Sequence, residues 1–308
     1  MKKGYDRRTF LKNSLTATTG IAAGTGVIAK TAAWASTPVT RPIPKRPLGK
    51  TGHQVSILGL GGLYTPSMHD QHEKALEIAN RAIDLGINYI DTAPRYGSGA
   101  SELNLGSVIA NRRDEVFLAT KSHDYTYDGT MAIVEESLQR LQTDHVDLLQ
   151  HHAVGIHGQL EELQQPNSAR KAFEDLRDQG VTKYLGVSGH SSRVLADALE
   201  DYPYDCALIT LNAARETMND PEDLERFFQV AADREVGVIA MKVVNRGALV
   251  DRGLQVKQLL PYVLSYPVAT AIMGISEVPY LEEDARIASA FEQLSEDEMT
   301  EIRELARA

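Results

Sequence analysis

Eight short apolar runs alternate with eight segments of helical periodicity, and this alternation leaves few folds open to the chain. The runs are rich in β-branched and aromatic residues, as buried strands are. They cover residues 55–60, 88–91, 116–120, 145–151, 184–187, 206–210, 236–240 and 270–273. Strands that alternate with helices form parallel sheets, because a parallel connection needs a crossover. Eight such units predict a closed (β/α)8 TIM barrel of the α/β class, with an open doubly wound sheet as the alternative.

The segments between the runs place apolar side chains on one helical face. In residues 72–85 the apolar positions recur every three or four residues, at Ala75, Leu76, Ala79, Ala82 and Ile83. The other helices are expected at 101–110, 130–141, 168–179, 193–200, 223–234, 254–266 and 279–290. Ser295 and Glu298 have the spacing of a capping box, which predicts a C-terminal helix after the last barrel unit.

The first 35 residues differ in character from the rest of the chain. They begin with Lys2, Lys3, Arg7 and Arg8, continue through a short, weakly apolar stretch, and end in Ala-Trp-Ala. This order is typical of a secretory signal, and the apolar stretch is too short to span a bilayer. The run Asp-Arg-Arg-Thr-Phe-Leu-Lys at 6–12 resembles a twin-arginine signal. That resemblance implies the twin-arginine export machinery as a partner and a periplasmic location for a protein folded in the cytoplasm.

Residues 36–47 contain Pro38, Pro42, Pro44 and Pro47, which predict a linker without regular structure. A short hairpin with its turn at 50–52 is expected next. We therefore expect a signal segment at 1–35, a Pro-rich linker at 36–47, and a single barrel domain at 48–308. Whether the signal is cleaved after residue 35 or kept as an anchor stays open.

Charge and cysteine content exclude several classes of function. Residues 1–35 hold six Lys or Arg and one Asp, a net charge of +5, so from a total of −10 the remaining residues carry −15. Such an acidic domain argues against nucleic-acid binding. Cys206 is the only cysteine, which excludes an internal disulfide and a Cys-based zinc site. The histidines lack a convincing ligand set, so no metal site is expected. We expect a monomer or a weak oligomer.

Polar residues follow the second, third and fourth runs, where an α/β barrel carries its reactive groups. The second run ends in Asp91, and Tyr96 follows it within the next loop. The third run leads into Lys121, and the fourth leads into His151 and His152. Alternation along a strand sends neighbouring side chains to opposite faces, so only one of the two histidines can face the barrel interior.

These stretches closely resemble the aldo-keto reductase superfamily. The matching motifs are Gly-Ile-Asn-Tyr-Ile-Asp-Thr-Ala-Pro-Arg-Tyr-Gly at 86–97, Ser-Glu-Leu-Asn-Leu-Gly at 101–106, Leu-Ala-Thr-Lys-Ser at 118–122 and Asp-Leu-Leu-Gln-His-His at 147–152. The resemblance implies an NAD(P)(H)-dependent oxidoreductase that interconverts a carbonyl (aldehyde, ketone or sugar) and an alcohol by hydride transfer. It assigns catalysis to Asp91, Tyr96, Lys121 and His152, and leaves His151 as a packing residue between strand and helix.

Elementary chemistry supports these implied roles. A tyrosine with a pKa near ~10 is a poor acid–base group at neutral pH. A neighbouring ammonium lowers that pKa, and Lys121 is placed to supply it. Asp91 would hold Lys121 in an ion pair, and His152 would orient the substrate oxygen. We therefore expect Tyr96 to be the general acid in reduction and the general base in oxidation.

The cofactor contacts implied by the resemblance are less complete. The family pattern Gly-Val-Ser-Asn, whose Ser and Asn hold the nicotinamide amide, keeps Ser188 but has Gly189 in place of Asn. Asn212, after the sixth run, is the residue that could compensate. Met241 stands where many members place an aromatic residue beneath the nicotinamide. Lys242 either contacts the pyrophosphate or is solvated.

The loop that binds the adenosine phosphate in the family lies at 274–284 in this chain. Gly274, Ser276 and Asp284 are its expected cofactor contacts. The loop contains no Arg or Lys, and Glu277 would repel a 2′-phosphate. Backbone amides at the helix start can still bind an anion. The family default favours NADP(H), whereas this local chemistry favours NAD(H), and we rank NADP(H) slightly ahead of NAD(H).

Two other functions remain open at this stage. A catalytically quiet barrel that binds nucleotide as a sensor or partner subunit is compatible with the changes at Gly189 and Met241. A lyase that forms a Schiff base on Lys121 is a further alternative, although it leaves Asp91 and Tyr96 without a purpose. Residues after the third and fourth runs predict a partly polar substrate pocket and do not identify the substrate.

Overall fold

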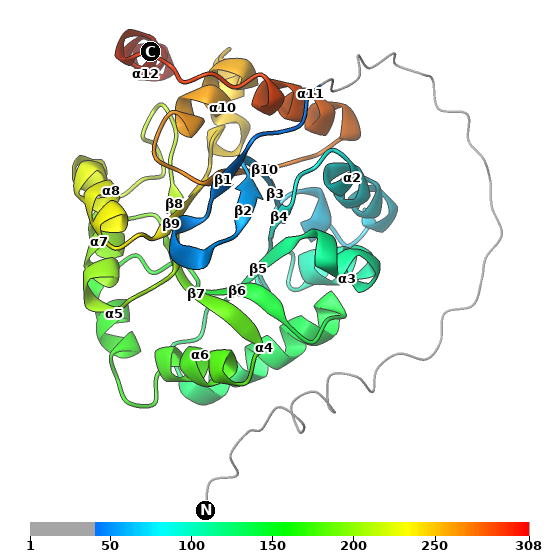
Figure 1. Cartoon of the computed structure of the whole chain (residues 1–308), viewed down its shortest axis with the longest axis vertical. Helices are drawn as coiled ribbons and strands as arrows, with labels where there is room; N and C mark the ends of the chain where they lie inside the picture. The colour runs from blue at the N-terminus through cyan, green and yellow to red at the C-terminus, as the bar shows by residue number, and fades with distance from the viewer. Residues whose placement is uncertain (1–40, 308) are drawn as a thin grey trace, which may run out of the picture.

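A closed barrel of eight parallel strands forms the centre of the protein (Figure 1). The computed structural model describes residues 41–307, so the predicted signal segment and residues 36–40 of the predicted linker lie outside the described residues. The strands are β3 (Leu58–Gly61), β4 (Tyr89–Asp91), β5 (Phe117–Ser122), β6 (Val146–His151), β7 (Thr182–Gly189), β8 (Cys206–Thr210), β9 (Gly237–Met241) and β10 (Thr270–Gly274). β10 pairs with both β3 and β9, which closes the sheet. The predicted (β/α)8 barrel is therefore confirmed, and the open sheet is wrong.

An antiparallel hairpin precedes the barrel and lies across one end of it (Figure 1). It consists of β1 (Lys45–Pro47), the 3-10 turn η1 (Gly49–Thr51) and β2 (Gln54–Ser56). The hairpin was expected, but two details differ. The run expected at 55–60 is divided between β2 and β3, and residues 45–47 of the expected linker are a strand. Pro47 is tolerated because it ends a strand of a two-stranded ribbon, where few ladder donors are needed.

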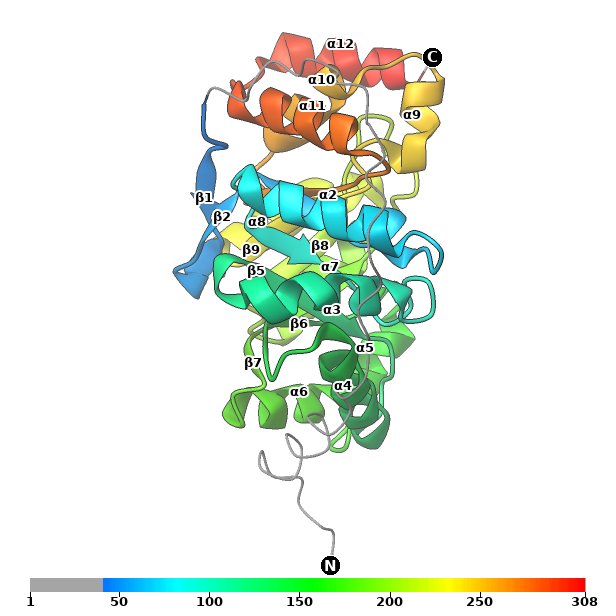
Figure 2. The ribbon, with the colours of Figure 1, turned by 90° about the vertical axis from the view of Figure 1, so that its right-hand side faces the viewer.

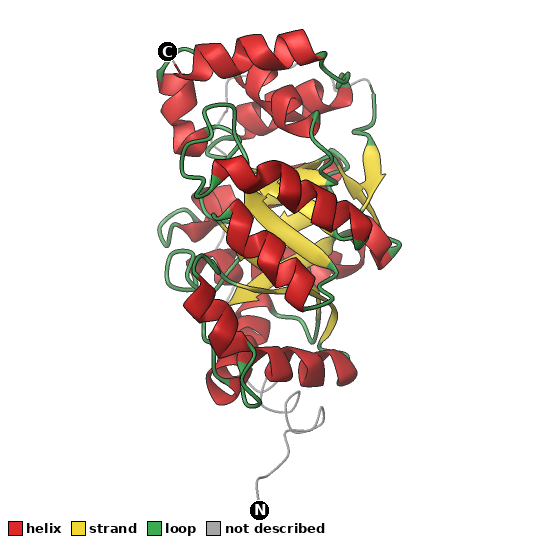
Figure 3. Ribbon diagram, turned by 90° about the vertical axis from the view of Figure 1, so that its left-hand side faces the viewer, coloured by secondary structure: helices red, strands yellow, loops and turns green. Residues whose placement is uncertain are grey.

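The helices surround the strands as an outer layer (Figures 2 and 3). Those of the eight repeating units are α2 (His72–Asp84), α3 (Ala100–Arg112), α4 (Tyr127–Leu141), α6 (Ala169–Asp178), α7 (Ser192–Asp201), α8 (Leu224–Asp233), α10 (Val256–Leu264) and α11 (Val278–Ser289). All eight agree with the expected segments to within a few residues at each end. Within residues 41–307, no helix has the length and apolar character needed to cross a bilayer.

Further helical segments complete the described chain. The helices α5 (His157–Leu163) and α9 (Ala248–Asp251) and the 3-10 turns η2 (Thr65–Ser67), η3 (Arg113–Glu115), η4 (Pro221–Asp223) and η5 (Asn245–Gly247) were not expected. The last helix, α12 (Glu296–Arg307), lies beyond α10 and α11 in Figure 2. Its capping box is present: the Ser295 amide donates to Glu298 Oε2 at 2.8 Å, and the Glu298 amide donates to Ser295 Oγ at 3.3 Å.

Two sets of buried apolar side chains give the barrel its stability. The larger set lies between the strands and the helices, and the smaller set fills the barrel interior near the hairpin. Tyr89, Phe117 and Leu148 belong to the interior set. Because strand side chains alternate between faces, the next inward positions toward the carboxyl ends include Asp91, Lys121 and Gln150.

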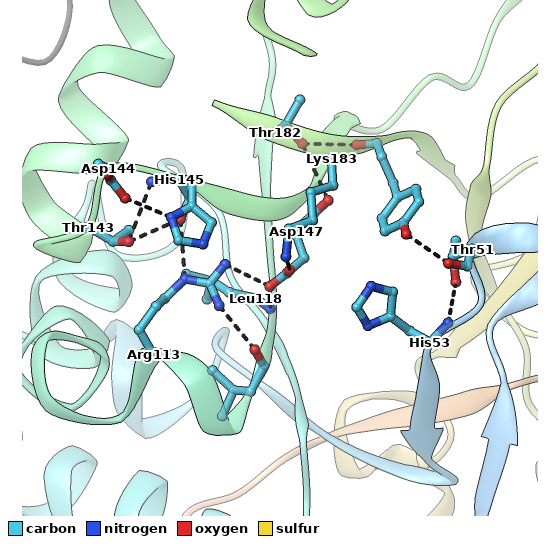
Figure 4. A network of polar contacts seen from close by, with 12 residues as sticks. Thr51, His53, Arg113, Leu118, Thr143, Asp144, His145, Asp147, Thr182 and Lys183 are labelled. Carbon is cyan, nitrogen blue, oxygen red and sulfur yellow. Dashed lines mark hydrogen bonds and ion pairs between the residues drawn. The ribbon is translucent and has the colours of Figure 1, made fainter. Parts of the chain in front are cut away.

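A polar network joins β5, β6 and β7 at the opposite end from these inward groups (Figure 4). Asp147 accepts hydrogen bonds from Arg113 Nη2 at 2.7 Å, from Lys183 Nζ at 2.9 Å and from the Leu118 amide at 2.9 Å. Burial raises the pKa of Asp147, but these partners outweigh it and hold the pKa below its ordinary value. These contacts join the first residues of β5, β6 and β7, so the role of the Asp147 carboxylate is structural.

Candidate active site

A buried ion pair between Asp91 and Lys121 occupies the carboxyl end of the barrel interior. Their side chains are 0% and 1% exposed. The Lys121 ammonium donates to Asp91 Oδ1 and, at 2.8 Å, to the carbonyl oxygen of Thr92. Gln150 Nε2 donates to Asp91 Oδ2 at 3.2 Å. The expected ion pair is therefore present, and each carboxylate oxygen of Asp91 has a donor.

Tyr96 lies over this pair, in the loop between β4 and α3. The Lys121 ammonium is 5.1 Å from the centre of the Tyr96 ring. The His152 ring lies edge-on to the Tyr96 ring, with 5.7 Å between centres and 80° between planes. Tyr96 and His152 are both partly exposed. The fold thus brings together all four residues that were expected to form the catalytic group.

The protonation of Tyr96 differs from the expectation. Burial raises the pKa of Tyr96, and this effect exceeds the lowering by the Lys121 ammonium, so the pKa lies above its ordinary value. Burial lowers the pKa of Lys121, but Asp91 and Tyr96 raise it further and keep the ammonium charged. The expectation of a lowered Tyr96 pKa is wrong for this site. Burial disfavours the charged phenolate more strongly than the Lys121 ammonium, which Asp91 partly neutralises, favours it. Tyr96 is a neutral phenol at neutral pH.

The two neighbouring histidines have different surroundings. His152 follows β6 at the barrel mouth, and burial, with Lys121 and other cations, lowers its pKa to about 3. Its Nδ1 has no hydrogen-bond partner among the described residues. His151 is buried and stacks on Phe173 of α6, with 3.9 Å between ring centres. The expectation that His151 packs between strand and helix is confirmed.

An elongated cavity of about 500 Å³ starts at Asp91 and Tyr96 and runs to the start of α11. Five of the expected cofactor contacts line it: Met241, Lys242, Gly274, Ser276 and Asp284. Arg246, which sequence reasoning did not single out, lines it as well. The side chains of Lys242 and Arg246 form no ion pair with any described residue, so two positive charges line the cavity without a direct partner.

The far end of the cavity carries carboxylates. Burial, followed by the charge of Glu283, raises the pKa of Asp284 to about 7. Glu277, at the start of α11, forms an ion pair with Lys74 of α2 at 2.7 Å. Neither residue of this pair lines the cavity, and the Lys74 charge is matched by Glu277 beside it.

The other two expected cofactor contacts, Ser188 and Asn212, do not line the cavity. Ser188 Oγ donates to the carbonyl oxygen of His151 at 3.0 Å and accepts from the amide of Ala153 at 3.1 Å. Asn212 uses both ends of its side-chain amide on the backbone of Glu216, at 2.8 and 3.1 Å. Both side chains therefore hold loops at the barrel mouth, and their contact with a cofactor stays a prediction.

The glycine that replaces the family asparagine has a packing reason. A Cβ atom at Gly189 would lie 2.3 Å from the carbonyl oxygen of Val154, in the loop after β6. This loop is held against β7 because the Val154 amide donates to the Ser188 carbonyl at 2.7 Å. No side chain fits at position 189 unless the backbone moves.

Gln150 and Arg246 are the site residues that sequence reasoning missed. Gln150 is in the register of the inward face, two residues before His152, and this parity was the available signal. Arg246 lies in the loop after β9, where unexpected left-handed conformations at Lys242, Asn245 and Arg246 set its direction. No local sequence pattern predicts those conformations.

Tyr96 lies over the Lys121–Asp91 pair at the carboxyl mouth of a closed barrel. Beside it lies a cavity lined by two cations without ion-pair partners. This arrangement is that of an oxidoreductase of the (β/α)8 class. The model of the Aldo/keto reductase family matches residues 57–261. The chain belongs to this family. It is an enzyme of carbonyl/alcohol oxidoreduction that depends on NAD(P).

Known proteins similar to this chain agree with the assignment. An uncharacterized oxidoreductase of Bacillus subtilis (strain 168), YqkF, is 28% identical over 84% of this chain and 95% of its own length. L-galactose dehydrogenase of Arabidopsis thaliana is 26% identical over 84% of this chain and 92% of its own. The structure of aldo-keto reductase AKR11C1 from Bacillus halodurans has a TM-score of 0.71 and 26% identity, covering 86% of this chain and 97% of that one. These relatives favour an enzyme over the catalytically quiet barrel.

Proposed function

We propose that Tyr96 exchanges the proton with the substrate oxygen when the enzyme interconverts a carbonyl compound and its alcohol. The observation that carries this proposal is the position of the Tyr96 ring, whose centre is 5.1 Å from the Lys121 ammonium. In reduction, the phenol donates a hydrogen bond to the carbonyl oxygen and passes its proton to that oxygen as negative charge develops on it. The phenolate that remains is stabilised by the Lys121 ammonium. In oxidation the same residues act in the reverse order.

The other two residues position this exchange. Asp91 holds Lys121 beneath the Tyr96 ring, because the ion pair fixes the ammonium in the barrel interior. His152 is neutral, so one of its ring nitrogens carries a hydrogen and can donate to the substrate oxygen. When bound, the nicotinamide supplies the hydride to the carbonyl carbon or takes it from the alcohol.

The cavity residues fit a dinucleotide. Lys242 and Arg246 have unmatched positive charges that would bind the pyrophosphate, and Met241 would pack against the nicotinamide ring. Ser276 and the backbone amides at the start of α11 would bind at the adenosine end. The ranking of NADP(H) ahead of NAD(H) rests on the family alone. Glu277, Glu283 and Asp284 would repel a 2′-phosphate, and we propose that NADH is used at least as well as NADPH.

The substrate class is a small carbonyl compound, which includes aldehydes, ketones and sugars. The relative named L-galactose dehydrogenase acts on a sugar, and the partly polar mouth around His152 is compatible with such a substrate. We propose a polar aldehyde or sugar over an apolar ketone.

The test is nucleotide titration by fluorescence, with NADH against NADPH, followed by turnover on a panel of carbonyl compounds. Tyr96→Phe should lower kcat by roughly 10²–10⁴-fold and leave the Kd for the nucleotide within about threefold, because the phenol oxygen serves the proton and not the nucleotide. Tyr202→Phe, which removes a partly buried phenol bound to Glu174 and outside the candidate site, is the matched control and should turn over normally. Undiminished turnover in Tyr96→Phe contradicts the proposal.

We further propose that the protein is exported through the twin-arginine pathway and acts in the periplasm. The support is the sequence of residues 1–35, with Arg7 and Arg8 before a weakly apolar stretch. Replacing both arginines by lysine in the full chain should leave the enzyme in the cytoplasmic fraction, whereas the unchanged chain should appear in the periplasmic fraction. Equal distribution of the two forms contradicts the proposal.

A further inference from the structure

The ammonium of Lys121 has a second acceptor besides the Asp91 carboxylate. It donates to the carbonyl oxygen of Thr92 at 2.8 Å, and Thr92 and Lys121 are both buried. A lysine ammonium is a compact charge on a flexible stem, so a single acceptor does not fix its direction. The Thr92 carbonyl therefore helps to set where this charge lies relative to the Tyr96 ring.

A pair of buried hydroxyls holds Thr92 in place. Thr92 Oγ1 and Ser101 Oγ are 2.7 Å apart, and both residues are 0% exposed. The Thr92 amide also donates to the Ala119 carbonyl of β5 at 2.9 Å. Ser101 is the second residue of α3, and Thr92 directly follows β4. The hydroxyl pair therefore joins the carboxyl end of a barrel strand to the start of the next helix.

Ser101 also holds the residue that is proposed to exchange the proton. Its backbone amide donates to the carbonyl oxygen of Tyr96 at 3.2 Å. Ser101 thus bonds through its side chain to Thr92 and through its backbone to Tyr96, which are the two ends of segment 92–96. The acceptor of Lys121 and the backbone of Tyr96 are in this way fixed to the same helix end.

The hydroxyl pair is tightly covered and lies outside the cavity. A Cβ atom at Gly62 would lie 2.4 Å from Ser101 Oγ and 3.2 Å from Thr92 Oγ1. The Gly62 amide donates to the Asp91 carbonyl at 2.7 Å, so the loop after β3 is held over the pair. Gly62 lines the cavity, whereas Ser101 and Thr92 do not. The pair can therefore affect the reaction only through the residues that it holds.

We propose that Ser101 is a positioning residue for the proton exchange. Its hydroxyl holds the Thr92 carbonyl, which in turn directs the Lys121 ammonium at the reacting phenol. Without this hydroxyl the ammonium keeps its pair with Asp91 but loses its fixed direction, so it stabilises the phenolate less as the proton leaves. The inference rests on the proposed function, since it concerns the same exchange at Tyr96.

The experiment removes the contact between the two hydroxyls from either side. Ser101→Ala and Thr92→Val should each lower the single-turnover rate of nucleotide oxidation by a carbonyl compound roughly ten- to hundredfold. The KM for the carbonyl compound and the Kd for the nucleotide should stay within about threefold of their values in the unchanged enzyme, because the pair contacts neither. The double variant should be no slower than the slower single one, since both changes remove one contact. If one single variant does not fold, the other tests the same contact.

Two further variants separate positioning from stability. Thr92→Ser keeps the hydroxyl and should keep most of the rate. Thr182→Val is the matched control: Thr182 is buried at the start of β7, at the opposite end of the barrel (Figure 4), and its hydroxyl donates to the Tyr184 carbonyl at 3.0 Å. Thr182→Val should keep the full rate even where its stability in urea falls as far as that of Ser101→Ala.

Each contrary outcome has a definite meaning. An undiminished rate in Ser101→Ala and Thr92→Val, beside an impaired Tyr96→Phe, overturns the inference and leaves the proposed function intact. The inference is also overturned by an equal loss in Thr182→Val, or by a loss in Thr92→Ser as large as that in Thr92→Val, because the hydroxyl contact would then not be the cause. Failure of the unchanged enzyme to turn over any carbonyl compound with either nucleotide removes the proposed function, and the inference with it.

Discussion

The ammonium of Lys121 is held by the carboxylate of Asp91 in a pair whose side chains are almost completely withheld from solvent. The same ammonium lies 5.1 Å from the centre of the Tyr96 ring. A charge in this position must be matched, because an isolated ammonium in the barrel interior would lose most of its hydration. Asp91 therefore stabilises the fold and keeps Lys121 charged for its action on Tyr96.

Removing the charge of Asp91 should destabilise the protein more than removing the whole pair. Asp91→Asn leaves Lys121 buried and unpaired, and we expect a loss of about 3–5 kcal/mol in the free energy of unfolding. Asp91→Asn combined with Lys121→Met removes both charges and should recover part of that loss. Chemical denaturation of the two variants and the unchanged protein gives the comparison. A double variant less stable than Asp91→Asn would show that the pair has a different role.

The rate of carbonyl reduction should be insensitive to pH across the neutral range. His152, with a pKa of about 3, stays neutral above about pH 4. Tyr96, with a pKa above its ordinary value, keeps its proton until the pH exceeds about 10. Because the reaction needs the protonated phenol, kcat/KM for reduction should fall only as the pH rises through the Tyr96 pKa. A limb between pH 6 and 8 that disappears in Tyr96→Phe would instead show a lowered pKa.

The barrel and the four grouped residues could be predicted because they depend on local patterns. The alternation of strands and helices predicts the parallel barrel. Residues at the carboxyl ends of its strands meet at one mouth, and this does not depend on the conformation of the loops. Asp91, Lys121 and His152 each follow or end a strand, so their convergence needs no knowledge of side-chain packing. The net pKa of Tyr96 was beyond such reasoning, because it depends on how much of the phenol is buried.

The cofactor contacts show where sequence reasoning stops. Ser188 and Asn212 have the residue types that bind an amide, but neighbouring backbone groups already use their hydrogen-bonding atoms. A polar side chain in a loop can satisfy the backbone or a ligand, and only the three-dimensional neighbours decide which. Arg246 shows the reverse case, since left-handed backbone angles turn a loop residue toward the cavity.

Adding a side chain at Gly189 should be costly. Its Cβ would meet a backbone oxygen, that of Val154, which cannot rotate away. We expect Gly189→Ala to lower the free energy of unfolding by about 1–3 kcal/mol. Gly158→Ala, at an exposed position near the start of α5 with no atom within 4 Å of the new Cβ, is the control and should be neutral or stabilising by up to about 1 kcal/mol. Equal stability of the two variants would mean that the loop after β6 moves freely.

The carboxyl of Asp284 should make stability depend on pH in the sense opposite to that of most carboxylates. Its pKa is raised to about 7, from 3.8, mainly by burial at the far end of the cavity. Between about pH 4 and 7 the folded protein holds a proton that the unfolded chain has released, so stability falls as the pH rises through this range and is constant above it.

Asp284→Asn removes this titration, because an amide stays neutral at every pH. Its stability relative to the unchanged protein should therefore rise by about 2 kcal/mol or more from pH 4.5 to pH 8, with most of the change between pH 5 and 7. Thermal unfolding across that range, without nucleotide, measures it. Asp251→Asn is the matched control for loss of a carboxylate, since Asp251 lines the same cavity but is exposed, and it is measured over the same pH range. A stability difference for Asp284→Asn that is flat from pH 4.5 to 8 would mean that this carboxyl is hydrated and ionised in the folded protein, and its repulsion of a 2′-phosphate would then begin at lower pH.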